Sequence, residues 1–359
     1  MFLWEDIMDL TTDFQELVSQ NLDYEFLRNK TLLITGATGM LGRYLTEYFI
    51  YLNAVKNLNL RILLIVRNLK KVELLFGDKL NKNIHCLVSE LNTPLRTEEK
   101  INYIIHAASL ADPQYYKTNP VDVALPNILG TYYLLELARK KKIEHFLYFS
   151  SAEVYGKISN SQLITENTLG TIDPLDIRSC YSESKRMGET LCKSYYEQYQ
   201  VPVTCLRIFH TYGPTLDYHH DQRVFSEFVK SVIENNQIVM KSTGEAKRAF
   251  CYVLDLVSAC LTLLSHGLPG EAYNMANDEC FVSIKELAQE IIKAFPDRNI
   301  SFYKENREIN SSYIENKVTT YINVSTQKLR ALGWKPTISI QDGFRRTIDM
   351  IEDELAHRR

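Results

Sequence analysis

Three residues have the types and spacing of a proton-transfer site. Ser151 follows an apolar run that predicts a strand, and Tyr181 and Lys185 are four positions apart in a segment with helical spacing. Residues four apart share a helix face, so the Lys185 ammonium is expected beside the Tyr181 phenol. A neighbouring cation lowers the pKa of a phenol from its ordinary value of about 10. The pattern predicts that Tyr181 is a general base that removes a hydroxyl proton, with Ser151 hydrogen-bonded to the same oxygen.

A glycine-rich turn near the start of the chain could hold a phosphate group. The apolar run 31–35 predicts a strand, which leads through Gly36-x-x-Gly39-x-x-Gly42 into a segment with helical spacing. Glycines let the backbone approach a pyrophosphate, and the amides at a helix N-terminus favour its negative charge. The alternative is a tight turn that binds nothing, but the strand–turn–helix context favours a dinucleotide. The residues expected to line this part of the cofactor site are Gly36, Thr38, Gly39, Met40 and Leu41.

The end of the second predicted strand bears on the choice of dinucleotide. An acidic residue there would bind the adenosine ribose of NAD, but the strand 61–66 is followed by Arg67. A guanidinium can pair with a 2′-phosphate, which favours NADP. The alternative is that Arg67 stacks on the adenine or faces solvent. The other expected cofactor residues are Glu90, Leu91, Ala107, Ala108, Ser109, Tyr181 and Lys185.

The elements that must position these residues alternate between strands and helices. Strands are predicted at 31–35, 61–66, 84–88, 103–106, 146–150 and 203–208, with helices near 120–140 and 182–199. This alternation predicts an α/β fold, built as a Rossmann-type doubly wound parallel sheet that helices cover on both faces. A smaller C-terminal α/β substrate domain is expected beyond the sheet.

The chain is expected to divide into three parts. Residues 1–29 have apolar positions from Leu3 to Leu27 at helical spacing, which predicts an amphipathic leader helix on the surface of the main body. Residues 30–208 are expected to form the dinucleotide-binding domain, to which residues 250–275 return. Residues 209–359 are expected to form mainly the substrate domain.

Composition and charge argue against several other classes of protein. The net charge of −3 gives no reason to expect a nucleic acid partner. No run is long and apolar enough to cross a membrane, and Met1 to Leu10 lack the basic region of a secretory signal. The seven cysteines are scattered without a C-x-x-C pair, which predicts reduced thiols, a cytoplasmic location and no metal site.

Taken together, the motifs resemble the extended short-chain dehydrogenase/reductases of the nucleotide-sugar epimerase/dehydratase group. The resemblance runs from Lys30 to the C-terminus. UDP-glucuronate decarboxylases are closest in their motifs. The matching segments are Glu153-Val-Tyr-Gly, Arg178-Ser-Cys-Tyr181, Asp221-Gln-Arg223-Val and Lys247-Arg248-Ala-Phe-Cys-Tyr252.

The resemblance implies an NAD(P)-dependent enzyme that acts on a nucleotide-sugar. The implied reaction starts with oxidation at C4 and leads to decarboxylation or 4-epimerisation. Glu153 is implied as an acid, base or positioning carboxylate, and Arg223 and Arg248 as ligands of the substrate's phosphates or acid group. Tyr116, His210 and Tyr252 are further expected substrate contacts. The resemblance also implies a homodimer, in which the helices near 120–140 and 182–199 pair across a two-fold axis.

Three departures from the family pattern keep other functions open. Ala152 replaces the Ser of the decarboxylases and the Asp of the dehydratases, which weakens the dehydratase interpretation. His210 replaces a usual Asn, and Arg67 replaces the acid that selects NAD. One alternative is an NADPH-dependent reductase of a nucleotide-linked sugar or keto-polyol, for example CDP-linked. Another is a non-catalytic dinucleotide-binding sensor, against which the serine, tyrosine and lysine together argue.

Overall fold

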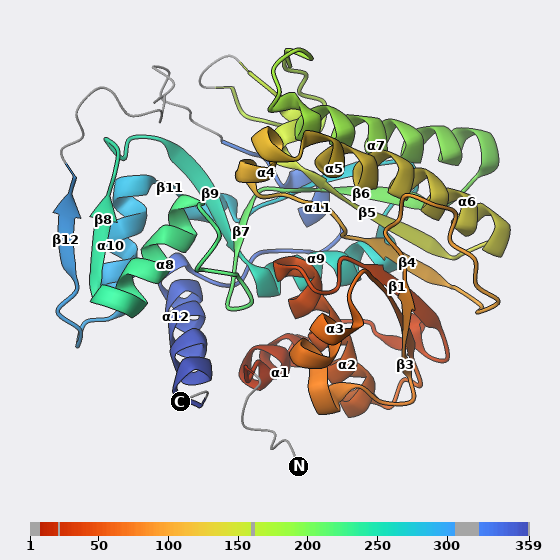
Figure 1. Cartoon of the computed structure of the whole chain (residues 1–359), viewed down its shortest axis with the longest axis horizontal. Coiled ribbons are helices and arrows are strands. Elements are labelled where there is room, and N and C mark those ends of the chain that lie inside the picture. Colours follow the sequence, from red (N-terminus) through yellow and green to blue (C-terminus); the bar gives the residue numbers. More distant parts are fainter. Residues whose placement is uncertain (1–7, 21, 159–161, 306–322, 358–359) are drawn as a thin grey trace.

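The computed structural model describes residues 8–20, 22–158, 162–305 and 323–357 of the 359-residue chain. Seven parallel strands form its central sheet in the order β10-β6-β5-β4-β1-β2-β3 (Figure 1). This arrangement confirms the predicted Rossmann-type doubly wound parallel sheet. The strands are β1 (Thr31–Thr35), β2 (Arg61–Val66), β3 (Ile84–Val88), β4 (Tyr103–His106), β5 (His145–Ser151), β6 (Val203–Ile208) and β10 (Ala272–Met275).

Helices cover both faces of this sheet because its central strands carry apolar residues on both sides. In β1, Leu32 and Ile34 pack into one apolar cluster and Leu33 into a second. The helices of the first cluster are α2 (Met40–Lys56), α3 (Leu69–Phe76) and α9 (Val253–His266). Those of the second are α6 (Thr131–Lys141) and α7 (Ser179–Tyr199), on the opposite side of the sheet (Figure 1).

The helix predicted near 120–140 is interrupted. After α4 (Pro113–Thr118), α5 (Pro120–Leu125) leads into a π-helical turn (Pro126–Gly130) before α6 begins. The proline at the start of this turn has no N–H to donate, so α-helical bonding cannot continue through it. The Asn127 side chain donates instead to the Val123 carbonyl (3.1 Å) and to Ser184 Oγ (3.0 Å), which joins the turn to α7.

The remaining elements form a smaller lobe beside the sheet (Figure 1). Its helices are α8 (Val224–Asn235), α10 (Ile284–Ala294) and α12 (Ile340–His357), and the short α11 (Gln327–Arg330) lies near β10. β8 (Gln237–Met240) pairs with β12 (Ser301–Lys304), while β7 (His210–Tyr212), β9 (Lys247–Tyr252) and β11 (Phe281–Ser283) form a second small sheet. Residues 250–275 run from β9 through α9 to β10, which pairs with β6 of the central sheet.

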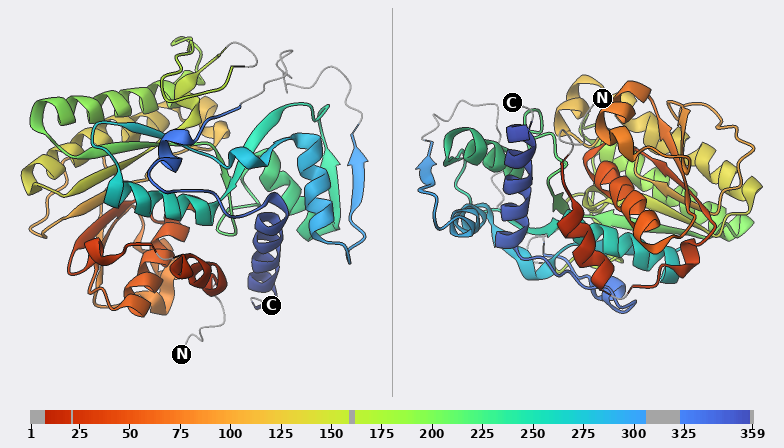
Figure 2. Two further views of the ribbon diagram at one scale, coloured as in Figure 1. Left: turned by 180° about the vertical axis from the view of Figure 1, so that it is seen from behind. Right: turned by 90° about the horizontal axis from the view of Figure 1, so that it is seen from below.

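The N-terminal leader contains a short helix with one buried and one exposed face. Its described part holds only α1 (Thr11–Ser19) and a 3₁₀ turn (Glu25–Leu27), and the apolar positions Leu3 and Ile7 lie outside the described residues. α1 packs against α2 and lies beside α12 (Figure 2). α1 buries Phe14 and Leu17 against the main body.

A buried carboxylate lies on the packed face of α1. Asp13 is completely buried, and it accepts hydrogen bonds from the hydroxyls of Tyr44 (2.6 Å) and Tyr252 (2.5 Å). The Arg346 guanidinium of α12 donates a third (2.8 Å). A charge so far from water is stable only with such partners, so this carboxylate fixes α1 between the two lobes.

Candidate active site

The strand order reverses between β1 and β4. β2 and β3 extend the sheet on one side of β1, while β5 and β6 extend it beyond β4 on the other. In sheets of this type a ligand binds beyond the carboxyl ends of the strands at the point of reversal. The glycine turn after β1 and residues 107–109 after β4 lie there.

The glycine turn has the shape of a phosphate cradle. Gly36 has a φ of +73°, and a Cβ there would lie 2.7 Å from the Ala107 carbonyl carbon and from the Ala108 nitrogen. A Cβ on Gly42 would lie 2.1 Å from the Gly36 oxygen. No side chain caps the first turn of α2, so its amides can bind an anion. These residues therefore fit a dinucleotide phosphate.

The end of β4 is fixed against this turn. Thr35 Oγ1 lies 2.8 Å from His106 Nδ1 and accepts a hydrogen bond from the Ala108 amide (3.1 Å). Burial, reinforced by the charge of Lys185, lowers the pKa of His106 to about 3, so the imidazole is neutral. The buried Ser109 hydroxyl lies beside the Tyr181 phenol and acts to lower its pKa.

α7 brings the predicted base and its lysine to the end of β5. Tyr181 and Lys185 are both buried. Lys185 Nζ donates a 2.7 Å hydrogen bond to the Phe149 carbonyl and lies 5.9 Å from the centre of the Tyr181 ring. The Tyr181 ring also stacks on Tyr116, so the position of the phenol is fixed from two sides.

Burial controls the protonation of this pair. It raises the pKa of Tyr181 to about 12, although the neighbouring hydroxyl of Ser151 lowers that pKa. Burial also lowers the pKa of Lys185 to about 7, and the Glu189 carboxylate opposes this change. A phenol with a pKa of about 12 is no base at neutral pH. Tyr181 therefore needs a further positive charge beside it, and the nicotinamide ring of an oxidised dinucleotide has that charge.

Three of the predicted substrate residues influence one another's charge. Burial lowers the pKa of His210 to about 3, and the charges of Arg248 and Arg223 add to this effect. Burial also lowers the pKa of Arg248, and the Glu153 carboxylate opposes that change. A neutral histidine thus lies near two guanidiniums, which together suit an anionic ligand.

Arg223 connects this group to the glycine turn. Its guanidinium donates to both oxygens of Asp221, at distances from 2.5 to 3.0 Å, and its Nη2 lies 3.7 Å from Met40 Sδ. Thr215 Oγ1 donates to the Met40 carbonyl (2.8 Å). Sequence reasoning gave no role to Asp221 or to Asn127, although both lie in motifs whose spacing matched the family.

Not every predicted residue reaches the site. Tyr252, an expected substrate contact, is completely buried, and its hydroxyl donates to Asp13 of the leader (2.5 Å). Arg67 and Glu90 are exposed beyond β2 and β3. Leu91 is buried in the second apolar cluster with a φ of +61°.

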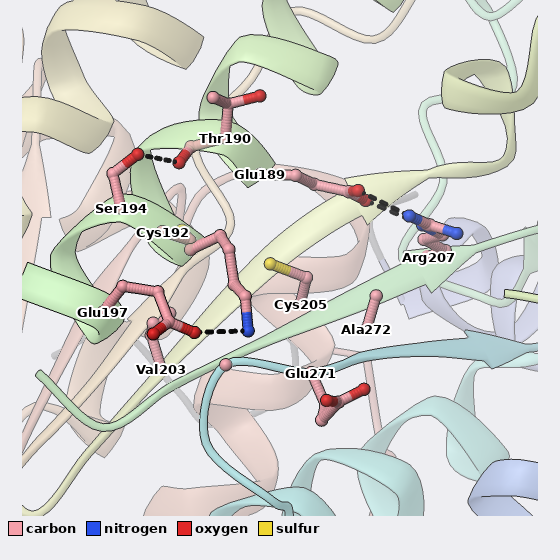
Figure 3. A pocket seen from close by; sticks show the side chains of 12 residues that line it. Glu189, Thr190, Cys192, Ser194, Glu197, Val203, Cys205, Arg207, Glu271 and Ala272 are labelled. Carbon is pink, nitrogen blue, oxygen red and sulfur yellow. Dashed lines mark hydrogen bonds and ion pairs between the residues drawn. The ribbon is translucent and has the colours of Figure 1, made fainter. Parts of the chain in front are cut away.

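Two cavities lie away from the glycine turn. The larger, of about 490 Å³, lies between α7, β6 and β10, and Glu189 faces Arg207 across it (Figure 3). The smaller, of about 380 Å³, adjoins Arg330.

Within the described ranges, no three His, Cys, Asp or Glu side chains are placed to hold a metal ion. None of the helices there has the length and apolar character needed to cross a membrane.

Comparisons with known proteins agree with this geometry. The model of the NAD dependent epimerase/dehydratase family matches residues 32–276. The chain is 30% identical to UDP-glucuronic acid decarboxylase 1 of Xenopus tropicalis, over 92% of this chain and 74% of that protein. It is 27% identical to dTDP-D-glucose 4,6-dehydratase of Bos taurus, over 89% of this chain and 88% of that one.

Solved structures show the same fold. UDP-glucuronic acid 4-epimerase of Bacillus cereus, in complex with UDP-glucuronic acid and NAD, superposes with a TM-score of 0.70 at 23% identity. The match covers 89% of this chain and 98% of the epimerase. The resemblance predicted from the motifs is thereby confirmed, and we conclude that this chain belongs to the NAD dependent epimerase/dehydratase family.

Proposed function

We propose that this protein oxidises a nucleotide-linked sugar at C4, as the first step of a decarboxylation or a 4-epimerisation. The observation that carries this proposal is the placement of the Tyr181 phenol. The phenol lies near Ser151 and Lys185. The hydroxyl of Ser109, a residue that follows β4, acts to lower the pKa of Tyr181. A proton acceptor beside a dinucleotide cradle is what the oxidation of an alcohol needs.

In the proposed reaction, Tyr181 removes the proton of the C4 hydroxyl. Ser151 holds the same oxygen, and the Lys185 ammonium stabilises the phenolate form of Tyr181. The residues proposed to hold the dinucleotide are Gly36, Thr38, Gly39, Met40, Leu41, Ala107, Ala108 and Ser109. A dinucleotide held by these residues would supply the hydride acceptor for C4 and the hydride donor for the later reduction.

The substrate's anionic groups are proposed to bind Arg223 and Arg248. Arg223 is oriented by Asp221 and lies near Met40, so it is suited to the phosphates beside the glycine turn. The Glu153 carboxylate acts to raise the pKa of Arg248. Arg248 is suited to an anionic group near the sugar. His210 and Tyr116 are proposed to complete the pocket.

The fate of the 4-keto sugar depends on the substituent at C6. If C6 is a carboxylate, the keto group accepts the electrons of the bond that breaks, and carbon dioxide leaves. If it is not, rotation of the keto sugar before it is reduced gives the 4-epimer. Ala152 offers no acid for a dehydration, so we do not favour that outcome.

The choice between NAD and NADP separates the proposed function from a second candidate function. Arg67 is exposed after β2, where a guanidinium is free to meet a 2′-phosphate, and we propose that NADP binds at least as well as NAD. Preferential use of NADPH would favour the net reductase of a nucleotide-linked sugar or keto-polyol. The non-catalytic sensor is the third and weakest candidate.

Two further properties are proposed with this function. Val121, Tyr132, Met187 and Tyr199 of α5, α6 and α7 are exposed apolar or aromatic side chains, which supports a homodimer through these helices. The free thiols of all seven cysteines support a cytoplasmic location.

The test is to incubate the protein with UDP-, CDP-, GDP- and dTDP-sugars and follow product mass together with the absorbance of reduced nicotinamide. Loss of carbon dioxide without net cofactor change supports decarboxylation, and a new stereoisomer of unchanged mass supports epimerisation. Stoichiometric cofactor consumption supports the reductase. No conversion of any sugar in the presence of either dinucleotide would contradict the proposed function.

A further inference from the structure

The surroundings of Lys185 contain a carboxylate to which the proposed reaction assigns no role. Glu189 follows Lys185 by four residues on α7, so both side chains lie on the helix face that packs against β5 and β6. Gly188 makes this packing close, because a Cβ there would lie 2.1 Å from the Tyr148 hydroxyl oxygen. The lysine and the carboxylate are therefore held against the same part of the sheet.

The Glu189 carboxylate is oriented by two strands. Arg207 of β6 donates to both of its oxygens, at 2.9 and 2.7 Å. Ser150 of β5 lies opposite Arg207 in the sheet register, and its hydroxyl donates to Glu189 Oε1 (2.5 Å). The strand residue before Ser150 is Phe149, whose carbonyl accepts the hydrogen bond from Lys185. One short stretch of β5 thus positions both the ammonium and the carboxylate.

Among the described residues, His106, Tyr148 and Tyr181 also face Lys185, and none of these three carries a negative charge at neutral pH. Burial lowers the pKa of His106, on β4, and it raises the pKa values of Tyr148 on β5 and Tyr181 on α7, so all three are neutral. The thiol of Cys205 on β6 also has a raised pKa, and beside it lies the thiol of Cys192. Arg207 is a cation, but it is bound to Glu189.

We propose that Glu189 is a positioning residue for the tyrosine–lysine pair, and that its carboxylate, oriented by Arg207 and Ser150, keeps the buried Lys185 in its charged form. A charged Lys185 is what the proposed function requires, so the inference rests on that function. The direction agrees with the electrostatics, since burial lowers the pKa of Lys185 and Glu189 raises it. The cavity in Figure 3 is lined by Glu189 and Arg207, while Lys185 does not line it and stays buried.

The test measures the protonation of Lys185 directly and needs neither substrate nor cofactor. Lysines are labelled with carbon-13 at Cε, the Lys185 resonance is assigned by its loss in Lys185→Met, and its chemical shift is followed against pH. Glu189→Gln keeps the size of the side chain and removes its charge, so the apparent pKa of Lys185 should fall by roughly one pH unit. An unchanged titration in folded Glu189→Gln would overturn the proposal.

The matched control is Glu197→Gln, because Glu197 lines the same cavity eight residues further along α7 and pairs with Lys193 (2.8 Å). It should leave the titration of Lys185 unchanged, and an equal fall there would also count against a specific role. If Glu189→Gln does not fold, Glu189→Asp and Ser150→Ala test the proposal instead. Glu189→Asp displaces the carboxylate and Ser150→Ala removes one of its hydrogen-bond donors, so each should lower the pKa of Lys185 by a smaller amount. No fall in either variant would overturn the proposal.

The turnover of the same variants separates this inference from the proposed function. If a nucleotide-sugar is converted, Glu189→Gln should lower kcat roughly 3- to 10-fold near neutral pH, with KM little changed and the alkaline limb of the pH profile moved to lower pH. If no sugar is converted by the wild type, the proposed function fails, while the titration of Lys185 still decides the role of Glu189.

Discussion

The Tyr116 ring stacks on the Tyr181 ring, with centroids 5.0 Å apart and planes inclined by 12°. This contact holds the predicted base without using its hydroxyl, which stays directed to other partners. The Tyr116 hydroxyl donates to the Ala111 carbonyl (3.0 Å), and this bond fixes the position of the Tyr116 ring. The two tyrosines therefore offer a matched pair for separating chemistry from packing.

Replacement of the base, Tyr181→Phe, should lower kcat by roughly 10²- to 10⁴-fold, because the variant keeps the stack and loses the proton acceptor. Calorimetric titration should show that dinucleotide binding is largely unchanged. Tyr116→Phe, which also keeps the stack, should retain most of the activity. Turnover of Tyr181→Phe at the wild-type rate would show that another group is the base.

Gly36→Ala should abolish measurable dinucleotide binding. The new Cβ would lie 2.7 Å from the backbone of Ala107 and Ala108, and the φ of +73° is unfavourable for alanine. The control is Gly333→Ala, where φ is +93° and nothing lies within 4 Å of the new Cβ. Fluorescence titration with the reduced dinucleotide checks both variants. Equal losses of binding would point to general destabilisation instead of a blocked cradle.

Arg67→Asp should shift the cofactor preference toward NAD, because a carboxylate repels a 2′-phosphate and accepts from the ribose. A charged hydrogen bond of this kind corresponds to about a ten- to hundred-fold change in relative affinity. The measurement is calorimetry of the cofactor-free protein with both dinucleotides. Lys70→Asp, three residues further along and also exposed, should change the preference little. Strong NAD preference in the wild type would make Arg67 a surface group.

Acid should destabilise the fold through its buried histidines. Burial lowers the pKa of His145 to about 4, and its Nε2 lies 2.9 Å from Thr204 Oγ1. The unfolded chain binds this proton near pH 6.5 and the folded chain does not, so stability is present above that pH and is lost toward pH 4. His145→Gln should remove about 1.4 kcal/mol per pH unit from the slope in that window.

Urea unfolding at a series of pH values checks this slope. The control is His357→Gln, at the exposed end of α12, which should leave the pH dependence as it is in the wild type. A His145→Gln slope equal to that of the wild type would contradict the assignment.

Asp13→Ala should lower the free energy of unfolding by about 3 kcal/mol, since it removes the acceptor of the buried Tyr44 and Tyr252 hydroxyls and of the part-buried Arg346 guanidinium. Arg346 keeps Asp342 (2.7 Å) and Glu16 (2.6 Å) as partners, which limits the loss. Asp23→Ala, in the exposed part of the same leader, should cost far less. Comparable losses from the two variants would show that the leader is stabilised along its whole length.

Four of the strands could be predicted from the sequence because they are largely buried on both faces. The ranges 31–35, 61–66, 103–106 and 203–208 are mainly apolar or β-branched, while 84–88 is a half-exposed edge strand, and all five coincide with strands of the sheet. The glycine turn and the Tyr181–Lys185 spacing are equally local signals. Such features can be recognised from one short segment of the sequence without knowledge of its distant partners.

The features that were missed depend on partners far away in the chain. Asp13 looks like a surface residue of an amphipathic helix until Tyr252 and Arg346 are placed beside it, 239 and 333 positions later. The same pairing engages the hydroxyl of Tyr252, which sequence reasoning expected to contact substrate. The π-helical turn at Pro126–Gly130 was missed because its bonds to α7 become visible only in the packed structure.

The buried position of Asp13 has a consequence for the order in which the protein is made. A ribosome releases the N-terminus first, so α1 emerges long before the tyrosine of β9 and the arginine of α12 exist. Until then its carboxylate has too few partners to leave water. The docking of α1 onto β9 and α12 can therefore be completed only after those two elements have been synthesised.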